Sequence, residues 1–276
     1  MQENGFSDQQ IDRFRAHQRT AFAIQESIAS SLVAGMTEKD VTRQLMKGYR
    51  AAGAQSYFHL PVALFGSRTA LPDPWDTLGF WPTDRLLQEG DAIILDGSPI
   101  FDGFVVDTSY ATSFGPNAAQ ATMAADDLPY RHSILDAVRA GATFAEIAVA
   151  VDEHLTANGY SNRHVLHPGE VLGHRALYVD RDPQPDEFGF DQGVIRHFVK
   201  GSKIAEANAG ATPSPTWNHH VGSQHKPADG LWAVEPHIAR DGLGVKWEEL
   251  LVIQGSEVYW LDDDVPHVTN AAASPP

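Results

Sequence analysis

The stretch that decides the fold is Leu95-Asp96-Gly97-Ser98-Pro99-Ile100-Phe101-Asp102-Gly103-Phe104-Val105-Val106-Asp107-Thr108-Ser109. Asp96 follows the apolar run 91–95, which is typical of a fully buried strand, and Asp107 follows the apolar run 103–106. An ionised carboxylate is costly to bury without a partner, so two of them on neighbouring core strands indicate a compensating cation. The turn residues between them fit a plain hairpin equally well, so this stretch alone leaves both interpretations open.

Two glutamates occupy similar positions in the second half of the chain. They lie in Leu231-Trp232-Ala233-Val234-Glu235-Pro236 and in Lys246-Trp247-Glu248-Glu249-Leu250-Leu251-Val252-Ile253, each at the edge of an apolar strand. Two aspartates, two glutamates and one histidine from between them form an oxygen-rich set suited to two divalent ions. Such a set favours Mn, Fe or Co and also allows Zn.

The order Asp96, Asp107, histidine, Glu235, Glu248 resembles the pita-bread (M24) metallopeptidases, which include methionine and Xaa-Pro aminopeptidases, prolidases and creatinase relatives. The aspartates are eleven positions apart, as in the family's first motif. Asp107-Thr108-Ser109 is similar to the methionine aminopeptidase version, and 234–236 and 247–249 match the two glutamate motifs, with Glu248 in the ligand register. The resemblance extends from the first helix to about Leu261.

The resemblance implies an α+β pita-bread fold with two pseudo-symmetric helix-helix-sheet halves around a dinuclear metal site. It implies a metal-dependent hydrolase that cleaves a peptide or amide C–N bond with a metal-bridging hydroxide, the ions being bridged by Asp107 and Glu248 and Glu235 moving the proton. Two alternatives stay open. One is a hydrolase or lyase acting on a non-peptide small molecule, and the other is a metal-free binding module.

The histidine ligand is ambiguous, because His167 and His174 lie seven positions apart. We favour His174, since Val171-Leu172-Gly173 precedes it like a buried strand and Gly173-His174 matches the family's Gly-His pair. In the other interpretation His167 is the ligand and His174 faces the substrate. If His174 is the ligand, the substrate-facing histidine is expected from residues 218–225, as His225 or His220, with His167 as the next catalytic candidate.

A second departure lies upstream of Asp96. Family peptidases carry a further histidine there, whereas Asp76-Thr77-Leu78-Gly79-Phe80-Trp81-Pro82 has none, and His59 is the nearest earlier one. This puts peptide hydrolysis, but not metal binding, in question. Trp75, Phe80, Trp81 and Trp217 are suited to line an apolar site or to be ordinary core.

The apolar periodicity predicts two similar halves within one domain, residues 1–276. Helices are expected at 7–33, 37–49, 127–140 and 144–158, the last opened by a capping box at Thr143 and Glu146. Strands are expected at 56–65, 92–95, 104–113, near 233, at 250–253 and at 257–261. An insertion at about 180–227, rich in proline and glycine, is expected to be partly an irregular loop that narrows the site to small ligands.

Composition restricts the partners. The 276 residues carry a net charge of −16, which argues against a nucleic-acid surface, and no cysteine, which excludes thiolate metal sites. The polar start Gln2-Glu3-Asn4-Gly5 and the lack of a long apolar run predict a cytoplasmic protein that does not enter membranes. We expect a small-molecule or short peptide substrate, and a homodimer is compatible with the sequence.

Overall fold

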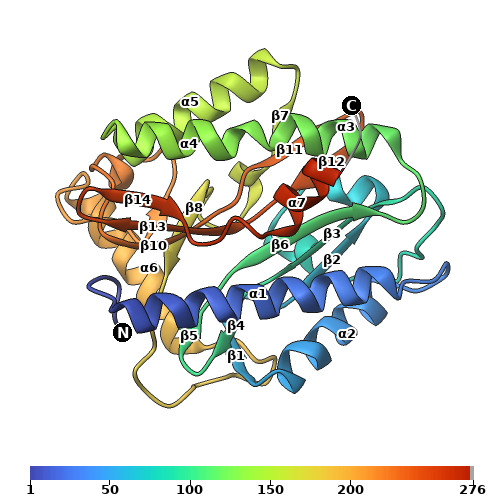
Figure 1. Cartoon of the computed structure of the whole chain (residues 1–276), viewed down its shortest axis with the longest axis horizontal. Coiled ribbons are helices and arrows are strands. Elements are labelled where there is room, and N and C mark those ends of the chain that lie inside the picture. The colour runs from blue at the N-terminus through green and yellow to red at the C-terminus, as the bar shows by residue number, and fades with distance from the viewer. Residues whose placement is uncertain (274–276) are drawn as a thin grey trace.

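The computed structural model describes residues 1–273 as a layered arrangement of helices and strands (Figure 1). The helices are α1 (Asp8–Ser30), α2 (Glu38–Ala51), α3 (Ala118–Asp127), α4 (Pro129–Arg139), α5 (Phe144–Ala157), α6 (Gln192–Ala207) and α7 (Pro266–Ala273), with 3₁₀ turns η1 (Gly66–Ala70), η2 (Thr77–Phe80), η3 (His164–Leu166) and η4 (Val221–Ser223). The strands are β1 (Ala54–Tyr57), β2 (Val62–Phe65), β3 (Ala92–Gly97), β4 (Pro99–Phe101), β5 (Phe104–Val105), β6 (Thr108–Ser113), β7 (Ser161–Asn162), β8 (Gly173–Ala176), β9 (Thr216–Trp217), β10 (Gly230–Val234), β11 (His237–Arg240), β12 (Leu243–Lys246), β13 (Glu249–Gln254) and β14 (Glu257–Trp260).

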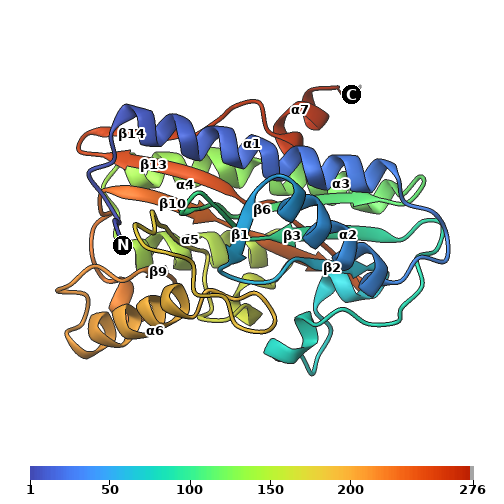
Figure 2. The ribbon, with the colours of Figure 1, turned by 90° about the horizontal axis from the view of Figure 1, so that it is seen from below.

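The expected α+β class with two helix-helix-sheet halves is confirmed. The first half contributes the sheets β2-β3-β6 and β1-β4-β5, and the second contributes β14-β13-β10-β8-β9 and β12-β11-β7. Helices α1 and α2 cover one side of the strands, while α3, α4 and α5 lie on the other (Figure 2). No helix in residues 1–273 is long and apolar enough to span a membrane.

The two halves are joined directly through their strands. Ser109 N, in β6, donates a hydrogen bond to the carbonyl oxygen of Glu248 at 3.4 Å. Strand β12 also packs against β3, β6 and η1. The contact with η1 requires glycine at position 244, because a Cβ there would lie 2.0 Å from the carbonyl oxygen of Thr69. Strand β12 is therefore held close to the first half.

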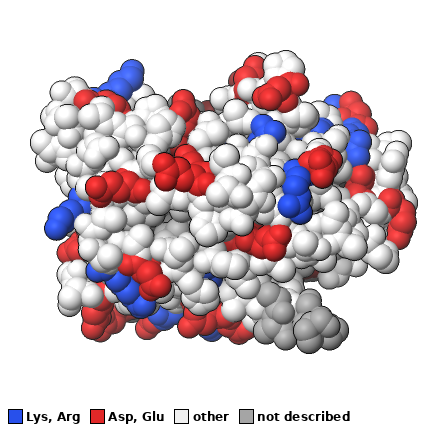
Figure 3. All heavy atoms as spheres, turned by 90° about the horizontal axis from the view of Figure 1, so that it is seen from above, with Lys and Arg blue, Asp and Glu red and all other residues white. Residues whose placement is uncertain are grey.

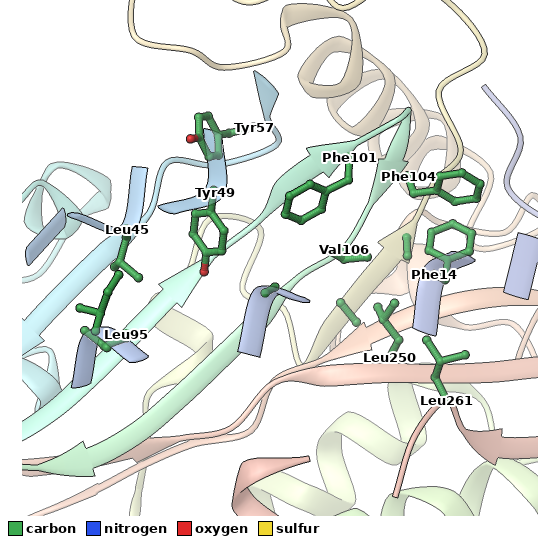
Figure 4. Packing of buried hydrophobic residues seen from close by; sticks show 14 of the residues in the cluster. Phe14, Leu45, Tyr49, Tyr57, Leu95, Phe101, Phe104, Val106, Leu250 and Leu261 are labelled. Atoms are coloured by element: carbon green, nitrogen blue, oxygen red, sulfur yellow. The ribbon is translucent and has the colours of Figure 1, made fainter. Parts of the chain in front are cut away.

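The largest core cluster is shared by both halves. It combines Phe14 of α1, Leu45 of α2 and Leu95 of β3 with Leu250 of β13 (Figure 4). Burial of such side chains contributes about 1.5–3 kcal/mol each, so this cluster strongly favours the docked halves. A second cluster, under α4 and α5, contains the four tryptophans 217, 232, 247 and 260.

The helix starts follow the expected capping chemistry. Thr37 and Thr143 each accept a hydrogen bond from the backbone three residues on, and Asp40 and Glu146 complete the two capping boxes. The strands differ more from expectation. The single strand expected at 56–65 is divided into β1 and β2, which belong to different sheets, because Pro61 between them has no N–H for a ladder.

The strand expected at 104–113 is likewise divided, into β5 and β6. Asp107 lies at the break, so its backbone is not part of a regular strand ladder. Helices α3 and α7 and the hairpin of β11 and β12 were not expected from the apolar pattern. On the face shown in Figure 3, basic side chains are scattered among acidic ones.

The insertion contains a helix that its composition did not predict. Helix α6 occupies its middle, and Asp191 caps it by accepting from Gly193 N and Val194 N, both at 3.0 Å. Asp191 is 1% exposed and also pairs with Arg181 and accepts from Gln184 N at 3.1 Å. Although burial raises the pKa of Asp191, the hydrogen bonds from Arg181 and the backbone lower it below its usual value.

Asp191→Ala is expected to lower the free energy of unfolding by about 2 kcal/mol at neutral pH, because it removes the cap and leaves Arg181 without its partner. Since the folded pKa is depressed, the contribution is fully present above the ordinary aspartate pKa and is lost progressively as pH falls through the lower folded pKa. Denaturant unfolding at pH 7 and pH 3.5 measures both effects. Glu187→Ala, an exposed change in the same insertion, is the control, and an equal loss in both variants would contradict the role of Asp191.

Candidate metal centre

The side chains of Asp96 and Asp107 come from the first half and lie where the two halves meet. Asp96, in β3, lies opposite Val62 of β2 and Ser109 of β6, so the run of apolar residues before it anchors the strand in the core. Asp107 lies between β5 and β6 and is 1% exposed. Both carboxylates are buried where the two halves meet.

The second half supplies the other three expected ligands. His174, in β8, lies opposite Ala233 of β10, and Glu235 directly follows β10. Glu248 lies between β12 and β13 and is fully buried. His174 Nε2 is 3.1 Å from Asp107 Oδ2 and 3.6 Å from Glu248 Oε1. The structure thus brings together all five residues that the sequence suggested as metal ligands.

His59 also reaches this cluster, from the connection between β1 and β2. Its Nε2 lies 3.2 Å from Asp107 Oδ1 and 3.7 Å from Asp96 Oδ1. The two oxygens of Asp107 therefore face two imidazoles, His59 on one side and His174 on the other. The sequence left open whether His59 arrives here, because a residue 37 positions before Asp96 is placed only by the tertiary fold.

Lys246 is the residue that the sequence interpretation missed. Its Nζ lies 2.5 Å from Asp96 Oδ2, 2.9 Å from Glu235 Oε2 and 2.9 Å from Glu248 Oε2. A signal was present, because residues two apart in an extended segment share a face, and Lys246 is two residues before Glu248. The centre therefore contains four carboxylates, two imidazoles and one ammonium.

The charged groups in this cluster shift one another's pKa values. Burial lowers the pKa of Lys246, but the carboxylates of Asp96, Glu235 and Glu248 outweigh it and raise the pKa well above the usual value. Burial raises the pKa of Glu235, but the nearby Lys246 charge lowers it well below its usual value. Burial together with the charges of Asp107 and Glu235 raises the pKa of Glu248 to about 8.

The residues fit divalent ions. Two sets of three each offer ligand atoms that lie within 4.8 Å of one another: His59, Asp96 and Asp107, and Asp107, His174 and Glu248. Asp96 Oδ1 and both carboxylate oxygens of Glu248 are buried without a hydrogen-bond partner in residues 1–273, which is unfavourable unless a cation or another donor satisfies them. Carboxylate oxygens with one imidazole per set suit the ions expected from the sequence.

His167 lies in a hydrogen-bonded chain behind Glu235. His237 Nε2 donates to the carbonyl oxygen of Thr69 at 2.7 Å, so His237 Nδ1 is an acceptor and faces His167 Nε2 at 3.1 Å. His167 Nε2 therefore donates, and His167 Nδ1 lies 2.7 Å from Glu235 Oε2. A short contact between a lone pair and a carboxylate is repulsive, so the His167 and Glu235 pair holds one proton between them.

Aromatic side chains flank the centre. Phe58 lies 5.1 Å from His174 between ring centroids, and Phe198 of α6 stacks on Phe58 at 4.5 Å. On the other side, Phe80 contacts His167 at 5.4 Å and packs edge-on against Trp75. The insertion thus contributes to the surroundings of the centre through Phe198.

The other two histidines suggested for substrate contact lie elsewhere. His225 Nε2 accepts from Ser214 N at 3.0 Å and its ring packs on Phe144 of α5, because Phe144 N is bonded to the His225 carbonyl oxygen at 3.1 Å. His220 lies 3.0 Å from Glu170 and forms with it and His219 a partly exposed cluster. The structure does not bring His225 or His220 into contact with the four carboxylates of the centre, and Trp217 is a core residue.

A carboxylate and histidine cluster buried between two helix-helix-sheet halves defines the chain as a pita-bread protein of the metallopeptidase class. A family model described as metallopeptidase family M24 matches residues 13–255, and the chain belongs to that family. No curated protein shows significant sequence similarity to it.

Solved structures share the fold at low sequence identity. An X-Pro aminopeptidase from Thermotoga maritima has a TM-score of 0.66 at 20% identity, covering 96% of this chain and 64% of that one. A prolidase from Pyrococcus horikoshii gives 0.64 at 17%, covering 92% and 62%. A methionine aminopeptidase from Rickettsia prowazekii gives 0.60 at 15%, covering 95% and 99%. The chain therefore spans less than two thirds of the first two proteins and nearly all of the third.

Asp107→Asn is expected to abolish tight binding of divalent ions, because Asp107 is common to both ligand sets. Isothermal titration with Mn²⁺ and the rise in Tm on adding Mn²⁺ measure the loss, and the rise should disappear. Asp102→Asn, in the exposed turn between β4 and β5, is the matched control. Wild-type metal uptake by Asp107→Asn would refute the assignment of the centre.

Proposed function

We propose that this protein is a metal-dependent hydrolase that cleaves a peptide or amide C–N bond in a small substrate, with Asp96, Asp107, His174, Glu235 and Glu248 as the metal ligands. The observation that carries the proposal is the convergence of four buried carboxylates from both halves. Asp96, Asp107 and Glu248 contact His59 or His174, and Glu235 contacts His167 and Lys246. Divalent ions bound there, with Mn²⁺ as our first choice, supply Lewis acidity that polarises a carbonyl group and acidifies water.

Glu235 is the proposed proton carrier. Its Oε2 faces His167 Nδ1 and Lys246 Nζ. These two contacts fix the orientation of the carboxylate and favour its ionised form. An ionised carboxylate can take a proton from the attacking water and deliver it to the leaving amine. His167 is 7% exposed and contacts Glu235, so its proposed role is to hold Glu235 in position.

His59 is the proposed substrate-binding histidine. Its side chain is 34% exposed, whereas that of His174 is 6% exposed, so His59 is the imidazole on the open side of the centre. From there it can donate a hydrogen bond to a substrate carbonyl as charge develops on the oxygen. His59 thereby supplies the histidine whose absence upstream of Asp96 put peptide hydrolysis in question.

The aromatic surroundings favour small substrates. Trp81 directly follows Phe80, whose ring contacts His167. Phe188, in the insertion, directly precedes Gly189, whose carbonyl oxygen accepts a hydrogen bond from Tyr57 N. The rings of Trp81 and Phe188 meet at 5.6 Å although both are more than 40% exposed. We infer that this contact spans the approach to the centre, which also keeps a non-peptide small amide as a second candidate substrate.

Glu235→Gln is expected to lower turnover by roughly 10²–10⁴-fold, because the amide cannot accept the proton. The assay is a panel of Xaa-Pro dipeptides, methionyl peptides and small amides, each with Mn²⁺, Co²⁺, Fe²⁺ or Zn²⁺. Glu257→Gln, an exposed change in β14, is the control. Cleavage of the amides alone would establish the second candidate. A wild-type protein that binds metal and cleaves no member of the panel would contradict the proposed hydrolase and favour a binding module.

Replacing both Trp81 and Phe188 by alanine is expected to raise kcat/KM for longer peptides by roughly tenfold relative to dipeptides, because the ring contact that limits access is removed. The ratio of kcat/KM for a tetrapeptide and a dipeptide is the measurement. Leu78→Ala, 71% exposed in η2, is the control. An unchanged ratio would show that the aromatic contact does not select substrates by length.

A further inference from the structure

The ammonium group of Lys246 is surrounded as a metal ion would be. Three carboxylates, from Asp96, Glu235 and Glu248, lie 2.5–2.9 Å from Nζ. Nζ donates a hydrogen bond to Asp96 Oδ2, and its ion pairs with Glu235 and Glu248 compensate the positive charge. The fourth carboxylate, Asp107, is instead held by His59 and His174.

Lys246 is also fixed in this place by the chain. It is 2% exposed, and its backbone pairs with His237 across the hairpin of β11 and β12. Gly244, two residues earlier, packs on the backbone of Thr69 and donates to its Oγ1 at 2.9 Å. Withdrawal of the ammonium would leave it buried without a counter-charge, which is strongly unfavourable.

The ion pair with Lys246 restricts what Glu248 can offer to metal. Glu248 Oε2 lies 2.9 Å from Lys246 Nζ without a hydrogen bond, so an ion bound to Oε2 would lie beside the ammonium, whereas Oε1 faces His174 at 3.6 Å. A carboxylate that bridges two ions uses one oxygen for each, so Glu248 can ligate one ion and not bridge a pair while Lys246 is in place. The set with all members buried is Asp107, His174 and Glu248, whereas the second set includes the partly exposed His59.

We propose that Lys246 takes the place of one of the two expected ions, so that the chain holds one divalent ion tightly, between Asp107, His174 and Glu248. This inference rests on the proposed metal centre, in which it assigns Asp96 and Glu235 to Lys246 instead of to an ion, but it does not rest on hydrolysis. It also implies that the metal-free protein remains folded, because a cation supplied by the chain itself always neutralises part of the carboxylate cluster.

The test is the stoichiometry and stability of Lys246 variants. Chelator-stripped wild-type protein is titrated with Mn²⁺ by calorimetry, and bound metal is counted after desalting. We expect about one tightly bound ion in the wild type and in Lys246→Arg, and about two in Lys246→Met, with the second ion bound at least tenfold more tightly than in the wild type. In EDTA, the Tm of Lys246→Met should fall by at least about 5 °C and recover on adding Mn²⁺.

The controls separate this effect from other metal binding. Lys226→Met removes an exposed lysine of the same half and should change neither stoichiometry nor Tm. Because Glu170, His219 and His220 can take a surface ion, every titration is repeated with His219 and His220 both replaced by alanine.

Two equally tight ions in the wild type would overturn the inference, and so would a single ion in a folded Lys246→Met. If Lys246→Met does not fold, the wild-type and Lys246→Arg titrations still decide. A single tight ion without hydrolysis of any substrate would leave this inference standing and refute the proposed function. A wild type that binds no ion would refute both.

Discussion

The structure depends on neutralising four carboxylates that are buried where its two halves meet. An isolated buried charge costs several kcal/mol, so Asp96, Asp107, Glu235 and Glu248 are tolerated only in the presence of cations or strong donors. The chain supplies Lys246 from the second half and imidazoles from both halves. Because Lys246 of the second half pairs with Asp96 of the first, the charges are compensated only when the halves are docked. The shared apolar cluster supplies most of the driving force for docking, and the charge pairs determine how the two halves are aligned.

The local irregularities of the strands follow from the same constraint. Two of the four carboxylates lie outside the strands: Asp107 at the break between β5 and β6, and Glu248 between β12 and β13. The carbonyl oxygen of Glu248 then accepts from Ser109 N, so the break itself forms the link between the halves. Continuous strands would be more regular, but they would hold these side chains in alternating positions set by the pleat rather than facing one another.

The sequence predicted the parts of this site that local pattern determines. Asp96 and Glu235 stand out because each ends an apolar run, and the capping boxes mark the helices that support them. His59 and His237 could not be assigned, because nothing near them in the chain indicates that they meet Asp107 and His167. Lys246 carried a local signal, the alternation with Glu248, but a lysine beside a glutamate is usually solvated. Helix α6 was missed because its flanking prolines and glycines dominated the composition, whereas its cap at Asp191 depends on Arg181 and on β1.

An ammonium and a metal ion are not equivalent counter-charges, and the difference matters for this centre. Lys246 is covalently attached, so its charge is always present, whereas an ion exchanges with solvent and is lost to a chelator. Its single charge holds three carboxylates, one of them by a hydrogen bond, without drawing electron density from a substrate. Asp96 Oδ1 and Glu248 Oε1, which have no hydrogen-bond partner in residues 1–273, face the imidazoles, and there a divalent ion gains a ligand set. Lys246 thus organises the carboxylates, and the side of the centre bounded by His59 and His174 is left for chemistry.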